Sequence, residues 1–138
     1  MPLIKKITLL SIIFIVGFFI KANAEEIKKI GKFKDWEAMV VTDTTGKVCF
    51  AQSKPILQAP KSNKRDAKLF IAFRPSEKII NEVSVTAGYE FNKNNSITAT
   101  SGKNKFKFDI KEQGFAWIAD TKIEFRMIKR MKKGSRIM

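Results

Sequence analysis

The 138-residue chain contains no histidine and a single cysteine, Cys49. The absence of histidine removes the commonest general base and the commonest metal ligand, which excludes His-dependent catalytic triads and most zinc or copper sites. Because one cysteine cannot form an intramolecular disulfide, packing alone must stabilise the fold. Cys49 stands in an apolar stretch, so we expect it to be a small buried hydrophobe, with a reactive thiol as the alternative.

Acidic residues are scarce, since 13 Asp and Glu stand against 27 Lys and Arg. Gly-rich phosphate loops, metal-spaced clusters and nucleophile elbows are also missing from the sequence. Carboxylates remain the only candidates for acid–base chemistry, and no pair of them has a diagnostic spacing. Those near predicted elements are Asp35, Glu37, Glu82, Glu90, Asp109, Glu112, Asp120 and Glu124. We therefore expect a protein that is not an enzyme, with no metal and no cofactor.

Residues 1–24 have the organisation of a secretory signal peptide. Lys5 and Lys6 precede a 14-residue apolar run over 7–20, and Ala22-Asn23-Ala24 places small residues two apart at its end. We expect a signal helix that is cleaved after Ala24. A membrane anchor is the alternative, but a run of 14 falls short of the roughly 18 apolar residues that span a bilayer.

The remaining residues, 25–138, are enough for one hydrophobic core and one domain. Because residues 1–24 hold three lysines and no acid, this domain carries 24 basic and 13 acidic residues, a net charge of +11. Such a surface can bind nucleic acid, an anionic membrane or an acidic glycan, and export argues against nucleic acid. The alternative is a solvated surface made lysine-rich by coding bias, since phosphate sites favour the planar fork of arginine.

Alternating apolar and polar residues predict short antiparallel strands along most of the domain. The predicted strands are 33–40, 47–52, 69–73, 82–91, 96–100 and 105–110. The first two are expected to form a hairpin, preceded by a charged segment over 25–31 with no defined element. Prolines and polar residues predict a surface loop at 54–68.

Several strands carry more specific expectations. The 69–73 segment is almost entirely apolar, which predicts a central strand covered on both faces. Gly88 interrupts the 82–91 pattern, which favours a β-bulge, with a close backbone approach as the alternative. Three residues of the 105–110 alternation are expected to face inward: Phe106, Phe108 and Ile110.

After a brief apolar segment at 115–118, the period changes to that of a helix, predicted over 121–132. Asp120 is the expected N-cap, and Gly134 stands where a left-handed C-terminal residue belongs. The inward side recurs at four-residue spacing: Ile123, Met127 and Met131. Together with the strands, this predicts a mainly β fold, a single antiparallel β-sandwich or barrel-like domain with one helix in its C-terminal region.

The densest basic cluster lies in and just after this helix, in Arg126, Lys129, Arg130, Lys132, Lys133 and Arg136. Because apolar residues interleave with it, the segment resembles a basic amphipathic helix that binds an anionic membrane. The alternative is that the cations offset the helix macrodipole while the apolar side packs on the sheet. We take these six residues as the candidate anion-binding patch.

Candidates for a ligand groove, with core packing as the alternative, are Trp36, Tyr89 and Trp117.

Four segments also occur in a recognisable order. They are Gly-Lys-Phe-Lys-Asp-Trp at 31–36, Val-Cys-Phe-Ala-Gln-Ser-Lys-Pro at 48–55, Asn-Glu-Val-Ser-Val-Thr-Ala-Gly-Tyr at 81–89 and Met-Lys-Lys-Gly-Ser at 131–135. Over residues 30–138 the chain resembles the invasion-associated locus B family of alphaproteobacterial envelope proteins. The resemblance implies an exported, mostly β protein of a Gram-negative periplasm or outer envelope, linked in pathogenic relatives to host-cell invasion, without an established enzymatic activity or cofactor.

The same resemblance has two departures. Many relatives have more cysteines, so no disulfide framework carries over. Relatives also continue past Gly134-Ser135-Arg136 into further strand, so we expect a C-terminally truncated domain in which residues 135–138 leave an unpaired edge. The functional expectation is a non-enzymatic binding or interaction module for an unknown envelope protein. Its alternative is a basic protein that binds anionic lipid or glycan through residues 126–136.

Overall fold

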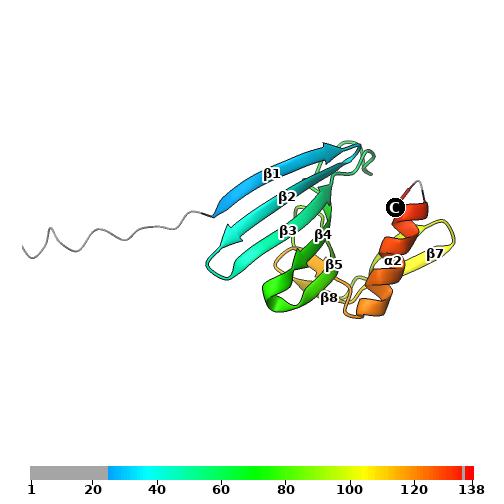
Figure 1. Ribbon diagram of the computed structural model, residues 1–138. Coiled ribbons are helices and arrows are strands. Elements are labelled where there is room, and N and C mark those ends of the chain that lie inside the picture. Colours follow the sequence, from blue (N-terminus) through cyan, green and yellow to red (C-terminus); the bar gives the residue numbers. More distant parts are fainter. Residues whose placement is uncertain (1–24, 135) are drawn as a thin grey trace, which may run out of the picture.

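Antiparallel strands dominate the structure, a computed structural model that describes residues 25–134 and 136–138 (Figure 1). The predicted signal helix and its cleavage site after Ala24 lie outside the described residues. In chain order the elements are β1 (Glu26–Phe33), β2 (Trp36–Asp43), β3 (Gly46–Ser53), β4 (Lys68–Arg74), the 3-10 turn η1 (Pro75–Glu77), β5 (Ile79–Thr86), β6 (Ile97–Ser101), β7 (Asn104–Phe108), β8 (Ile110–Glu112), β9 (Phe115–Trp117) and α2 (Thr121–Lys133).

In the described part of the chain, seven strands form one sheet in the order β1-β2-β3-β4-β5-β9-β8, and β6 pairs with β7 in a separate hairpin. Every pairing is antiparallel. The prediction of a mainly β, antiparallel fold with one helix near its C-terminal end is confirmed. Since the order begins at β1 and ends at β8, the large sheet has two edges rather than a closed barrel.

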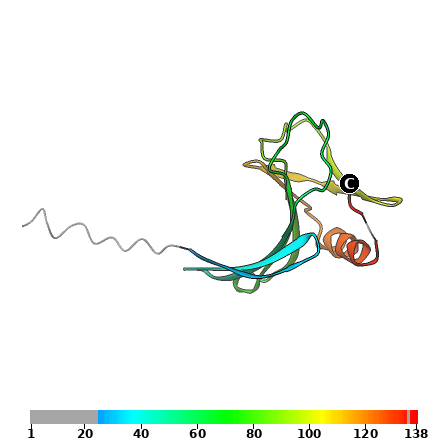
Figure 2. The same cartoon turned by 90° about the horizontal axis from the view of Figure 1, so that it is seen from above.

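The hydrophobic core lies at one end of this sheet. α2 and the β6–β7 hairpin lie on the same side of it, next to β5, whereas β1 and β2 extend away from them (Figure 2). The buried core residues are Val83, Ala99, Phe106, Phe108, Ala116, Ile118, Met127 and Ile128. The inward orientation expected for Phe106 and Phe108 is confirmed, since both belong to the core cluster. None of the residues in this cluster or packed against it comes from β1, β2 or β3.

The expectation that residues 25–31 form no defined element is wrong for 26–31, because these residues belong to edge strand β1. β1 pairs with β2 from Glu26 opposite Thr42 to Phe33 opposite Trp36, with a register shift between Lys29 and Gly31. This pairing uses backbone groups, so it requires no apolar alternation in an exposed edge strand. Periodicity therefore gave no signal for β1.

The strand predicted at 82–91 is β5, which runs from Ile79 to Thr86. Gly88 lies beyond it with a φ of 79°, so the predicted bulge is wrong. A Cβ at this position would lie 2.9 Å from the backbone nitrogen of Asp66. The close backbone approach, which was the alternative interpretation, accounts for this glycine.

The strand predicted at 105–110 is divided at Asp109. β7 ends at Phe108 in the small hairpin, and Ile110 begins β8, where it lies opposite Trp117 in the large sheet. Ile110 is 48% exposed, so its expected inward orientation is wrong. The chain changes sheets at this point, which reverses the side that the alternation would assign to Ile110.

The helix agrees closely with the prediction, since α2 begins after Asp120, whose carboxylate accepts a hydrogen bond from the Lys122 amide at 2.8 Å. Gly134 is extended rather than left-handed, with φ of −94° and ψ of 163°. The chain leaves the helix toward β6, where Met138 and Thr100 exchange two backbone hydrogen bonds of 2.6 and 3.0 Å. Met138 is thus paired, contrary to the expected unpaired edge; Ser135 lies outside the described residues.

β4 is central in the strand order but is not covered on both faces, as the sequence led us to expect. Leu69 and Ile71 pack against the core, whereas Phe73 is exposed. Cys49, which lies opposite Phe73 on β3, is a free thiol and only partly buried, so its predicted full burial is also wrong. Phe73 and Cys49 are not buried for the same reason, because α2 and the hairpin pack against β5 and do not extend over β3.

Candidate functional site

One face of the first strands is apolar and remains open. Ala38, Ala51 and Ile71 lie opposite one another on β2, β3 and β4, and Ile71 lies opposite the buried Val83 of β5. The face that α2 covers at β5 therefore continues, uncovered, toward β1. We call it the open sheet face, and its residues are Phe33, Trp36, Ala38, Val40, Cys49, Ala51 and Phe73.

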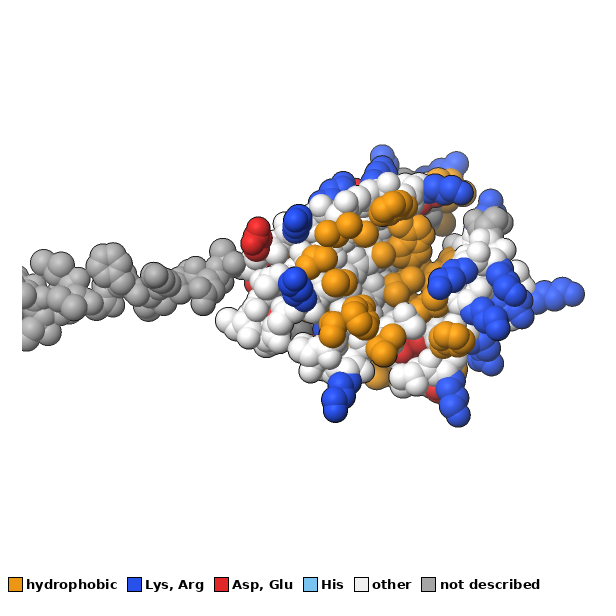
Figure 3. Space-filling view, in the orientation of Figure 1, with side chains coloured by type: hydrophobic (Ala, Val, Ile, Leu, Met, Phe, Trp, Pro, Cys, Tyr) orange, Lys and Arg blue, Asp and Glu red, His pale blue; other side chains and the backbone are white. Residues whose placement is uncertain are grey.

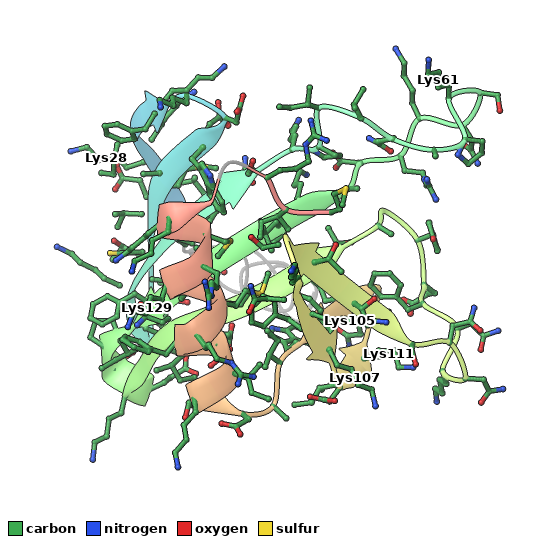
Figure 4. The ribbon with its side chains drawn as sticks, turned by 90° about the vertical axis from the view of Figure 1, so that its right-hand side faces the viewer. Lys28, Lys61, Lys105, Lys107, Lys111 and Lys129 are labelled. Carbon is green, nitrogen blue, oxygen red and sulfur yellow. The ribbon has the colours of Figure 1, made fainter. Side chains whose placement is uncertain are left out.

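Basic side chains border this face. Figure 3 shows hydrophobic side chains gathered over the strands beside α2, with lysine and arginine around them. Lys28 lies opposite Val40 at the β1 edge, and Figure 4 shows Lys28 and Lys129 projecting on the same side of the molecule. Phe125, one turn before Lys129 on α2, is 60% exposed, and Phe33 is 65% exposed. The border thus combines large apolar groups with cations.

The opposite face of the sheet is also largely apolar. A row of aromatic rings crosses it, with centroid distances of 6.3 Å for Phe50–Phe70, 6.0 Å for Phe70–Phe115 and 5.7 Å for Phe115–Trp117. Two ion pairs lie on it, since Lys29 contacts Glu37 at 2.8 Å and Arg74 contacts Glu82 at 2.7 Å. The Lys29 ammonium holds the pKa of the Glu37 carboxyl below its usual value. The two faces differ in that this one carries a row of ring contacts and two ion pairs.

The three aromatic groove candidates do not come together. Trp36 belongs to the open sheet face, whereas Trp117 stacks on Phe115 on the other side. Tyr89 lies in the segment after β5, where the Arg65 guanidinium sits 5.8 Å from its ring centre. The sequence-predicted groove is therefore not formed by these residues.

A cleft of about 510 Å³ lies between the C-terminal end of α2 and the β6–β7 hairpin. Three basic side chains line it, Arg130 and Lys133 from the last turns of α2 and Arg136 from residues 136–138. The hairpin contributes Ser101 and Asn104, and no Asp or Glu lines the cleft. We call this the basic cleft.

The structure divides the six predicted patch residues into two groups. Arg130, Lys133 and Arg136 line the basic cleft, whereas the other three lie on the exposed surface of α2 outside it: Arg126, Lys129 and Lys132. Within residues 25–134 and 136–138, none of the six takes part in an ion pair. At about 100° per residue, Lys129 and Lys132 fall on the helix flank of Phe125, and Arg130 and Lys133 fall on the other.

The sequence did not indicate Ser101 or Asn104 as site residues. The Asn104 amide donates to the Ser101 carbonyl at 3.2 Å, which fixes the turn of the hairpin. Gly134 approaches this turn so closely that a Cβ would lie 3.1 Å from the Ser101 hydroxyl oxygen. The only feature of the sequence that relates to this contact is Gly134, which follows the helix. Its position predicts a left-handed C-terminal residue, whereas the structure shows a close approach to Ser101.

Glu124 is the one carboxylate among the candidates that is buried, at 5% exposure. It accepts a hydrogen bond of 2.9 Å from the Val83 amide, at a position on β5 that the short strand β9 does not reach. Burial raises the pKa of Glu124, the hydrogen bond partly offsets that effect, and the charge of Glu82 adds to it. Glu124 therefore replaces a missing strand partner and joins α2 to the sheet.

The remaining acids are dispersed. Asp120 caps α2, Glu90 accepts a hydrogen bond from the Gly114 amide, and Glu82 is held by Arg74. Across the described residues, no group of three or more Cys, Asp or Glu side chains is placed to hold a metal ion. In the same part of the chain, no helix has the length and apolarity required to cross a membrane.

Comparison with known proteins yields no match to a family model, to a curated protein or to a solved structure. Two surfaces thus carry the functional inference. One is the open sheet face with its basic border, and the other is the basic cleft.

Proposed function

We propose that the chain is an exported, non-enzymatic envelope protein that binds an anionic bilayer surface through its open sheet face. The observation that carries the proposal is an apolar face bordered by lysine and arginine (Figure 3). Apolar side chains such as Phe33 and Phe125 favour the boundary between headgroups and acyl chains. Lysines such as Lys28 and Lys129 contribute about 1 kcal/mol each near an anionic membrane surface.

Charge favours a bilayer over a second copy of the chain as the occupant. Residues 25–138 carry a net charge of +11, so two copies facing each other repel, whereas an anionic surface attracts each copy. An uncovered apolar face of this extent is itself unusual for an isolated soluble domain, because such patches commonly mark interaction sites. An anionic bilayer satisfies both the apolar centre and the basic border.

Export and family membership belong to the same proposal and rest on sequence patterns. The basic start, apolar run and Ala-Asn-Ala ending of residues 1–24 support delivery to the periplasm or outer envelope. The four ordered segments support membership of the invasion-associated locus B family. A sandwich-like arrangement is supported by the core that the hairpin and sheet share. Cell fractionation tests the address: recovery in the cytoplasm with residues 1–24 intact would contradict it.

Vesicle sedimentation tests the binding surface. With vesicles of phosphatidylglycerol and phosphatidylcholine, we expect the Phe33→Ser/Phe125→Ser variant to bind at least about tenfold more weakly than the wild type. Burial of one such side chain is worth about 1.5–3 kcal/mol, and about 1.4 kcal/mol corresponds to a tenfold change.

The matched control is Ile110→Ser, because Ile110 is exposed but lies opposite Trp117 on the other face of the sheet. Its binding should equal that of the wild type. Unchanged binding of the Phe33→Ser/Phe125→Ser variant would contradict the assigned face. Equal binding to vesicles of phosphatidylcholine alone would contradict the role of the basic border, and no binding to either kind of vesicle would contradict a bilayer as the partner.

A further inference from the structure

The basic cleft has features that the open sheet face does not require. Arg130, Lys133 and Arg136 come from two different segments, the end of α2 and the chain beyond it, and they line one cavity. We infer that the basic cleft binds a phosphate-class oxyanion. This chemistry is shared by a lipid headgroup phosphate and free inorganic phosphate. The inference is independent of the membrane proposal, which uses Phe125 and Lys129 on the other flank of the helix.

In the described part of the chain, no Asp or Glu side chain offsets the positive charge of the cleft. The ion pairs of the described residues lie elsewhere, and the cleft lining holds three cations and no acidic side chain. Like charges held around one cavity repel, and a bound anion relieves that repulsion. A set of cations with no carboxylate side chain among them is the arrangement that an oxyanion satisfies.

The C-terminal end of the α2 dipole repels an anion only weakly. A helix C-terminus carries about half a negative charge, which is much less than three full positive charges. One of its terminal carbonyls, that of Arg130, already accepts a hydrogen bond from the Gly134 amide at 2.8 Å. The carbonyl of Met138, also at the cleft, accepts one from the Thr100 amide. The backbone acceptors nearest the cations are thus partly satisfied.

The kinds of side chain in the cleft match the proposed ligand. Arginine presents a planar fork that forms two parallel hydrogen bonds to phosphate, and lysine adds a compact charge. The Ser101 hydroxyl and the Asn104 amide provide neutral donors on the opposite wall. A volume of about 510 Å³ accommodates a phosphate with part of an attached group.

Coding bias toward lysine does not account for this composition. The chain has only five arginines, Arg65, Arg74, Arg126, Arg130 and Arg136, and two of the five line the cleft. A surface enriched in lysine by codon usage would show no such concentration of arginine at a cavity. The two arginines therefore favour a binding site over a solvated basic surface.

Titration with inorganic phosphate at constant ionic strength, with chloride as the replaced anion, tests the inference in the purified chain. We expect saturable binding that weakens at least about tenfold in the Arg130→Gln/Lys133→Gln variant. The matched control, Lys129→Gln/Lys132→Gln, removes the same charge from the other helix flank and should change affinity less than about twofold. Arg136→Gln provides a third variant outside the helix, and circular dichroism verifies that each variant is folded.

Vesicles containing phosphatidic acid distinguish the two sources of phosphate. Binding of inorganic phosphate that the Arg130→Gln/Lys133→Gln change abolishes supports a site for the free ion. Loss of binding to these vesicles alone in that variant supports a headgroup site. Equal weakening of phosphate binding by the two double variants would overturn the inference. The absence of phosphate binding would also overturn it if Arg130→Gln/Lys133→Gln weakens vesicle binding no more than Lys129→Gln/Lys132→Gln does. Because the phosphate titration contains no membrane, its result is separate from that of the Phe33→Ser/Phe125→Ser test.

Discussion

Replacing Phe108 with alanine is expected to lower the free energy of unfolding by about 3–5 kcal/mol. Phe108 lies at the end of β7, is 1% exposed and belongs to the core that joins the hairpin, β5 and α2. The loss combines the transfer of the ring to water with the cavity that remains. Because typical domains are stable by about 5–15 kcal/mol, this one change would remove a large part of the total.

Urea denaturation followed by tryptophan fluorescence measures this effect. Phe33→Ala is the matched control, since the same side chain is deleted at a site that is 65% exposed, and we expect a change below about 1 kcal/mol. If Phe108→Ala and Phe33→Ala had similar effects, the hairpin would not bury Phe108 against the sheet.

The second large effect concerns Glu124. Glu124→Ala leaves the buried Val83 amide without its hydrogen-bond partner, which should lower the free energy of unfolding by about 1–3 kcal/mol. Glu124→Gln keeps an oxygen that can accept this hydrogen bond, so it should be much less harmful. The difference between the two variants isolates the hydrogen bond from the loss of the acidic group.

The pH dependence of these variants follows from the raised pKa of Glu124. A raised folded-state pKa means that the protonated carboxyl favours folding, and this contribution is lost as the pH rises from the ordinary value of 4.5 through the folded-state pKa. Glu124→Gln cannot ionise, so its stability relative to the wild type should increase over that range. A difference in unfolding free energy that stays constant with pH would contradict the burial of an ionisable carboxyl here.

Local sequence signals predicted the elements whose side chains alternate between core and solvent. The hairpin of β2 and β3, the inward Phe106 and Phe108, and the Asp120 cap were all evident from spacing and residue type. In each case the feature is determined by residues that are close together in the sequence. Burial on one face and a capping carboxylate need no information about distant segments.

Features that depend on distant segments were not predicted. β1 is a strand because its backbone pairs with that of β2. Ile110 is exposed because the chain passes from the small hairpin to the large sheet after Phe108. Gly88 and Gly134 permit close approaches to Asp66 and Ser101, which are far away in the sequence. A single sequence without the fold contains no signal for any of these partners.

The candidate anion-binding patch shows the same division. Its six residues were evident as a run of basic side chains, but their separation into two helix flanks depends on where α2 meets the sheet and the hairpin. Arg136 lines the basic cleft because it lies close to Met138, which pairs with Thr100 of β6. The open sheet face was not predicted as a continuous surface, since it requires the strand order from β1 to β5.

The two tryptophans allow a direct test of the proposed membrane face. Trp36 belongs to the open sheet face, and Trp117 stacks on Phe115 on the opposite side. Each can be observed alone, Trp36 in the Trp117→Phe variant and Trp117 in the Trp36→Phe variant. The measurement is fluorescence quenching by phosphatidylglycerol vesicles with brominated acyl chains. We predict strong quenching of Trp36 and little quenching of Trp117; equal quenching of both, or quenching of Trp117 alone, would contradict binding through the open sheet face.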